Sequence, residues 1–129
     1  MSKNKDFSET SADRYSLALY ELAAESNELD VIEDHSSSII NLIIVNEDFS
    51  SLIKDPTNKK EDQLNALKKI SDQYKLNELL TKFLGFLIFK RRFFYVHKIL
   101  KSFVETCSIK RGELKAELIS AKNLNENEV

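Results

Sequence analysis

KFLGFLIFKRRFFYVHKIL, the stretch from Lys82 to Leu100, places an apolar run, a basic block and an aromatic cluster one after another. The apolar run, Phe83 to Phe89, is bounded by Lys82 and Lys90. A helix that spans a bilayer needs about 20 consecutive apolar residues. The run is too short for that, so it predicts a helix buried by protein rather than by lipid.

The composition of the whole chain favours helices. The chain has 129 residues, of which 42% are hydrophobic and 31% charged, with two glycines, one proline and no tryptophan. So few turn-forming residues among many Leu, Lys, Glu and Ile indicate long helices and an all-α fold. The length suits one hydrophobic core, and a net charge of −2 is too near neutral for a protein that binds a polyanion over its whole surface.

The predicted helix at 77–90 is apolar over an unusually wide arc. At about 100° per residue, Leu80, Leu84 and Ile88 form one stripe. Leu79, Phe83 and Phe86 form a second stripe, with Leu87 between the two. Two explanations stay open. The helix lies at the centre of a bundle, or one stripe faces the core while the other receives an amphipathic helix from a partner.

Helical periodicity predicts five further helices. Thr10 is the expected N-cap of the first, and Asp48 of the short third helix, which Pro56 should end. The helices are expected at 10–27, around 32–45, around 48–55, within 57–74, and from about 96 to just before Gly112. The predicted fold is therefore an all-α bundle of six helices, one of them short.

The pattern changes after Gly112. Leu114, Ala116 and Leu118 alternate with charged residues, which is typical of a half-buried strand. A single strand cannot form a sheet, so we expect an extended segment that opens a second, truncated domain. The expected organisation is a flexible tail at 1–9, a helical domain at 10–111 and the start of another domain at 112–129.

No catalytic, metal or cofactor site is expected. His35 and His97 lack metal-ligand spacing to other ligand residues, and His35 lies on an apolar seam, which favours a structural histidine. Gly85 and Gly112 cannot form a phosphate-binding loop. Cys107 has no disulfide partner in the chain, so we expect a buried thiol in a reducing compartment. The opening MSKNKDFSET has neither a signal core nor an organelle presequence.

The basic block leaves a second functional class open. A helical RNA-binding factor would use residues 90–101, with the aromatic side chains of Phe93, Phe94 and Tyr95 stacking on bases. Cations at Arg91 and Arg92 also suit the C-terminal end of a helix dipole, without any nucleic acid. An unrelated helical scaffold is the third class.

Four segments, taken in order, resemble the delta subunit of F-type ATP synthases, the oligomycin-sensitivity-conferring protein family. RYSLALYELAAESNELDVI is similar to the family's first helix, and NEDFSSLIKDP to the segment before its fourth. FKRRFFYVHKILKSF resembles the family's Asn-Gly-Arg-Leu turn, and LKAELISAKNLNENE its strand ending in Ser-Ala-x-x-Leu. Only Arg92 matches in the turn, since Lys90 and Arg91 replace Asn-Gly, and Ser16 stands where Ala is usual.

The resemblance implies a non-catalytic stator subunit. It would bind the N-terminal helix of an alpha subunit in a groove between helices 1 and 5, and join the b subunit of the peripheral stalk through the missing C-terminal domain. It would do so at the cytoplasmic face of a bacterial inner membrane, touching the membrane only through the complex and binding no nucleic acid. The groove residues carried over from the family are Tyr15, Ala18, Leu19, Leu22, Leu79, Phe83, Phe86 and Leu87.

Overall fold

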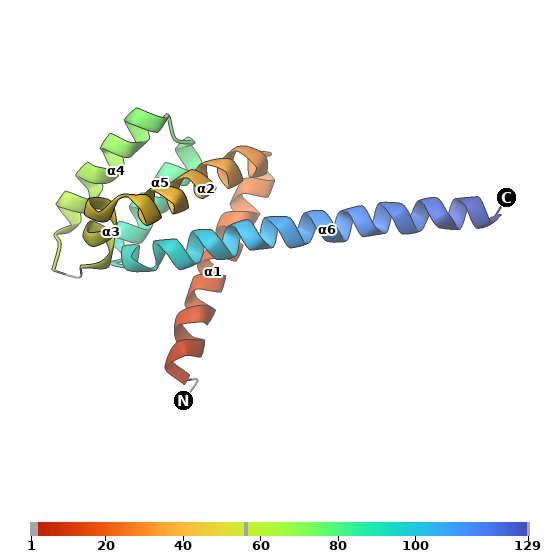
Figure 1. The fold of residues 1–129 in the computed structure, drawn as a ribbon, viewed down its shortest axis with the longest axis horizontal. Helices are drawn as coiled ribbons and strands as arrows, with labels where there is room; N and C mark the ends of the chain where they lie inside the picture. Colours follow the sequence, from red (N-terminus) through yellow and green to blue (C-terminus); the bar gives the residue numbers. More distant parts are fainter. Residues whose placement is uncertain (1–2, 56, 129) are drawn as a thin grey trace.

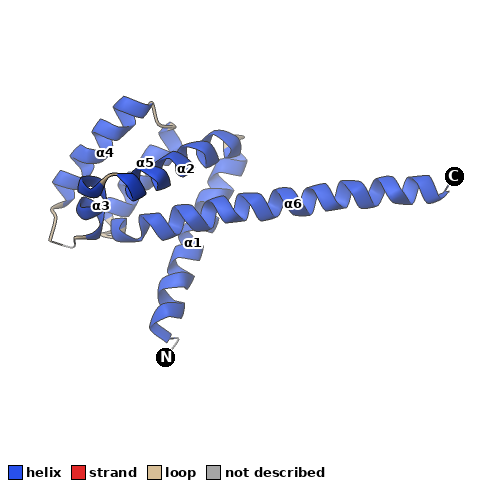
Figure 2. Ribbon diagram, in the orientation of Figure 1, coloured by secondary structure: helices blue, strands red, loops and turns tan. Residues whose placement is uncertain are grey.

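The computed structural model describes residues 3–55 and 57–128, with side chains described from 11 to 55 and from 57 to 122. Over these residues it consists of helices and the loops between them (Figure 2). The predicted all-α bundle is confirmed. The elements are α1 (Lys3–Glu25), α2 (Leu29–Val45), α3 (Glu47–Lys54), α4 (Lys60–Tyr74), α5 (Glu78–Phe89), the 3-10 helix η1 (Phe93–Tyr95) and α6 (Val96–Glu128).

One hydrophobic core joins the helices. α6 packs against α1 and α2, and crosses α1 in the view of Figure 1. α5 contacts α1, α2, α4 and η1. α5 buries five of its twelve residues, which belong to both of its apolar stripes. Fully burying one side chain of this size contributes about 1.5–3 kcal/mol. A position between several helices therefore explains most of the wide apolar arc of α5.

Three helices end on a non-glycine residue in the left-handed conformation: α1 before Asn27 (φ 57°), α4 before Lys75 (φ 50°) and α5 before Arg91 (φ 58°). After α5, the Arg92 N–H donates to the Leu87 carbonyl at 2.8 Å, and the Arg91 N–H to the Ile88 carbonyl at 3.0 Å. This is the Schellman arrangement, which satisfies the last carbonyls of a helix. The sharp turn into η1 therefore forms without glycine.

Asparagine side chains cap two helix starts. The Phe49 N–H donates to Asn46 Oδ1 at 3.0 Å at the start of α3, and the Leu80 N–H donates to Asn77 Oδ1 at 3.1 Å at the start of α5. The expected cap at Asp48 was wrong, because α3 begins at Glu47 with Asn46 as its N-cap, and Asp48 lies inside its first turn. Pro56, the expected end of that helix, lies outside the described residues.

The N-terminal boundary also differs from expectation. α1 begins at Lys3, so the N-cap expected at Thr10 was wrong, and residues 3–9 of the expected tail are helical; residues 1 and 2 are not described. No glycine or proline interrupts the sequence from Lys3 to Glu25, so nothing local stops the helix from extending toward the N-terminus.

The expected strand after Gly112 is helical. α6 continues to Glu128 and extends well beyond the other helices (Figure 1). The segment offers good helix formers and a Lys110–Glu113 ion pair at 3.9 Å, and residues 3–55 and 57–128 contain no strand with which it could pair. A Cβ atom at Gly112 would meet nothing within 4 Å. Gly112 therefore neither ends α6 nor makes room for a neighbour.

Candidate partner-binding face

α1 and α5 run antiparallel where they meet. The rings of Tyr15 and Phe86 lie 6.5 Å apart between centroids, which places the middle of α1 beside the C-terminal half of α5. At the other end, Asn77 Nδ2 donates to Glu28 Oε1 at 3.1 Å, which joins the N-cap of α5 to the N-cap of α2, three residues after the end of α1. These two side-chain contacts show that the helices run in opposite directions.

An exposed apolar surface follows this contact. Leu22 is 45% exposed and Phe86 46% exposed, Tyr15 and Leu79 are half-buried, and Ala18 is exposed. On a helix wheel, the three α1 residues lie within about 60° of one another, on the side that carries the contact with Phe86. We call this surface the α1–α5 face, made by Tyr15, Ala18, Leu22, Leu79 and Phe86.

Three of the eight predicted groove residues lie in the core instead. Leu19 and Leu87 have no exposed surface, and Phe83 is 7% exposed. Phe83, which the resemblance assigns to the groove, is therefore buried in the unbound chain. Phe83 lies only about 60° from Leu80 on the wheel, near enough for neighbouring helices to cover it. These side chains therefore belong to the core that supports the α1–α5 face.

Charged residues at the two ends of the face have opposite signs. Arg14 on α1 and Lys90 after α5 are exposed at the end marked by the Tyr15–Phe86 pair. The Lys90 ammonium lies 5.8 Å from the centroid of the Phe86 ring. Glu21 and Glu25 are exposed toward the C-terminal end of α1. Lys90 was not among the predicted groove residues, although its i,i+4 spacing from Phe86 was a usable signal.

The aromatic residues of the basic segment do not form one exposed platform. Phe93 is buried, while Phe94 lies with its ring centroid 4.1 Å from that of Tyr95. Arg92, the residue that matches the family turn, is exposed and contributes its backbone to the end of α5. Stacking on nucleic-acid bases would have to rely mainly on Phe94.

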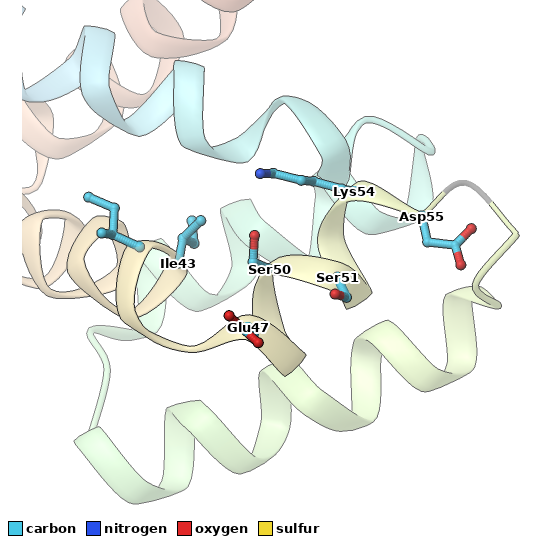
Figure 3. Close-up of a pocket in the computed structure, with 7 residues that line it drawn as sticks. Ile43, Glu47, Ser50, Ser51, Lys54 and Asp55 are labelled. Carbon is cyan, nitrogen blue, oxygen red and sulfur yellow. The ribbon is translucent and has the colours of Figure 1, made fainter.

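Among the described residues, the open depression between α2 and α3 does not bring catalytic side chains together. This depression has a volume of about 520 Å³, and the labelled Glu47 and Asp55 side chains lie apart from one another (Figure 3). Hydrogen bonds from Thr57 lower the pKa of Asp55. Among the side chains at 11–55 and 57–122, no group of three or more His, Cys, Asp or Glu could hold a metal ion.

The predicted structural roles of one histidine and the cysteine are confirmed. The Asn77 N–H donates to His35 Nδ1 at 2.9 Å, so this histidine helps to satisfy the backbone before α5. Cys107 is buried, and burial raises the pKa of its thiol to about 11. In the described part of the chain, no helix is both long and apolar enough to span a bilayer.

Comparison with known proteins identifies the family. The family model described as "ATP synthase delta (OSCP) subunit" matches residues 12–129. The chain is 81% identical over its whole length to ATP synthase subunit delta of Pelagibacter ubique (strain HTCC1062), covering 70% of that protein.

More distant relatives belong to the same family of delta subunits. The chain is 35% identical to ATP synthase subunit delta of Ruegeria sp. (strain TM1040), over 96% of the chain and 67% of the relative. It is 32% identical to that of Rhodospirillum rubrum, over 88% of the chain and 61% of the relative. The chain therefore spans between 61% and 70% of the length of these three relatives. The chain belongs to the ATP synthase delta (OSCP) subunit family.

Proposed function

We propose that this chain is a non-catalytic stator component that holds the N-terminal helix of an alpha subunit on the α1–α5 face. The observation that carries the proposal is the exposed apolar surface of Leu22 and Phe86 on two adjacent helices. A surface of this kind accepts the apolar side of an amphipathic helix. Membership in the delta subunit family supports the choice of partner.

A stator must resist torque without letting go of the catalytic head. Slow dissociation comes from buried apolar anchors more than from charges at the rim of an interface. Phe86 is suited to be such an anchor, because it is aromatic, half-exposed and supported by the Tyr15 ring. The delta subunits that this chain matches are longer than the chain, and a segment corresponding to their additional length would contact the b subunit. Contact with the membrane is then indirect, through the complex, and lies on the cytoplasmic face.

The test is a calorimetric titration with a peptide from the start of the cognate alpha subunit. Phe86→Asp should weaken binding at least about tenfold, roughly 1.4 kcal/mol, because a charge would replace an anchor in an apolar contact. The variant should remain folded, since Phe86 is 46% exposed. By contrast, Phe83→Asp and Leu84→Asp should both unfold the chain, because each would bury an unpaired charge.

α1 provides a matched control. Leu22→Asp and Leu17→Asp make the same change at residues that are 45% and 51% exposed, but Leu17 lies about 140° around the helix from Leu22. Leu22→Asp should weaken binding and Leu17→Asp should not. Equal effects of the two variants would contradict the α1–α5 face, and binding of RNA in place of the peptide would favour the alternative function.

A further inference from the structure

The distribution of charged residues along the α1–α5 face favours one orientation of a bound helix. This inference rests on the proposed function, because it concerns the same face and the same partner. Arg14 and Glu25 are eleven residues apart on one helix, which corresponds to about 16 Å. The Debye length at physiological ionic strength is about 8 Å. The two ends of the face therefore act on a partner as separate electrostatic environments.

The basic end lies where Tyr15 meets Phe86. Arg14 is exposed next to Tyr15 in the chain, and the Lys90 ammonium lies over the Phe86 ring, which keeps its charge beside the face. Because α1 and α5 are antiparallel, both helices bring a cation to this end.

The acidic end lies at the C-terminus of α1. Glu21 and Glu25 are exposed on the same side of α1 as Ala18, within about 60° of it on the wheel. Between the two ends, Lys82 and Glu78 form an ion pair at 3.4 Å, so their charges offset one another locally. The net polarity of the face therefore comes from Arg14 and Lys90 against Glu21 and Glu25.

We propose that the α1–α5 face binds a single amphipathic helix of about three turns whose two ends carry opposite charges, in one orientation. Its acidic end lies beside Arg14 and Lys90, and its basic end lies beside Glu21 and Glu25. Acidic residues favour the first turn of a helix and basic residues the last. A partner of that ordinary kind therefore runs parallel to α1 and antiparallel to α5.

Placement of a spin-labelled peptide tests the orientation. The probe is the N-terminal peptide of the cognate alpha subunit with a nitroxide at either end, added to the isotope-labelled chain. A label at the acidic end should broaden the amide signals around Lys90, and a label at the basic end those around Glu25. The orientation would be overturned by the opposite pattern of broadening or by equal broadening from both labels. It would also be overturned if the peptide that binds has no difference in charge between its two ends. Each of these results would leave the proposed function standing. Failure of the peptide to bind at all would overturn both.

Charge reversal supplies a second measurement. Glu21→Lys combined with Glu25→Lys should weaken peptide binding about fivefold at low ionic strength, and the loss should shrink as salt is added. The matched control makes the same charge change with Glu113→Lys and Glu117→Lys on the exposed part of α6, away from the face. If both double variants weaken binding equally, the effect is one of net charge, and the proposed orientation loses its basis.

Discussion

Arg91 adopts a conformation that L-residues other than asparagine and aspartate rarely use. Its φ of 58° places it in the left-handed region, where a Cβ atom is disfavoured and glycine fits without strain. The residue is exposed, and its backbone rather than its side chain makes the hydrogen bond that ends α5. The chain therefore tolerates a local conformational cost at this turn.

Replacing Arg91 by glycine should stabilise the protein. We expect Arg91→Gly to raise the free energy of unfolding by about 0.5–1 kcal/mol, because the relief of left-handed strain exceeds the added entropy of the unfolded chain. Urea unfolding monitored by circular dichroism measures the change. The adjacent Lys90→Gly is the control. Lys90 has a φ of −82°, so glycine there should destabilise, and a gain at both positions would contradict the strain argument.

At the scale of helices, α6 is tied to α2 near the point where it leaves the bundle. Arg111 donates through both of its terminal nitrogens to the two carboxylate oxygens of Glu33, from Nη2 to Oε2 at 2.9 Å and from Nη1 to Oε1. The side chain of Glu33 is 17% exposed. These hydrogen bonds hold the pKa of Glu33 below its ordinary value, and the positive charge of Arg111 adds to the effect.

This ion pair should make the stability of the protein depend on pH. Because the pKa of Glu33 is lower in the folded chain, its contribution is fully present above the unfolded value of 4.5 and is lost as pH falls through the folded value. The difference in unfolding free energy between the native chain and Arg111→Gln should therefore be constant near neutral pH and shrink in acid. Thermal melts at a series of pH values test this, with Lys110→Gln as the control. If the difference in unfolding free energy persisted at the lowest pH, it would not come from the Glu33–Arg111 ion pair.

On the scale of the whole molecule, the residues of α6 from Gly112 to Lys122 are not covered by any other element of the described structure. Every residue from Gly112 to Lys122 is exposed, including Leu114 and Leu118. The helical bundle should therefore not depend on this segment. We retain the domain boundary at 111–112 as a proposal, although the segment beyond it is helical here rather than extended.

Shortening the chain tests that boundary. A chain that ends at Gly112 should unfold with a free energy within about 0.5 kcal/mol of the original, because no buried side chain is removed from the described part of the bundle. A chain that ends at Thr106 should be clearly less stable, since it lacks the buried Cys107 and the Glu33–Arg111 ion pair. Chemical denaturation of the two shortened chains decides the matter. Large destabilisation in the first would place the boundary further along α6.

Much of the helical fold was predictable from local pattern. The spacing of apolar residues located α2, α4 and α5, and the scarcity of glycine and proline indicated helices throughout, because helix formation depends largely on near neighbours in the chain. The absence of ligand spacing around His35 likewise agreed with its structural role beside Asn77. Both kinds of inference need information only from within a few residues.

The candidate site depended on packing between helices. Phe83 and Phe86 share one stripe in the sequence, yet Phe83 is buried and Phe86 half-exposed, because exposure depends on which neighbouring helices cover each side chain. Likewise, Leu114 and Leu118 alternate as in a strand, but a strand requires a second strand to complete its backbone hydrogen bonds, and α6 satisfies these bonds within itself. Periodicity sets what each segment is able to bury, whereas the surrounding helices set what is buried.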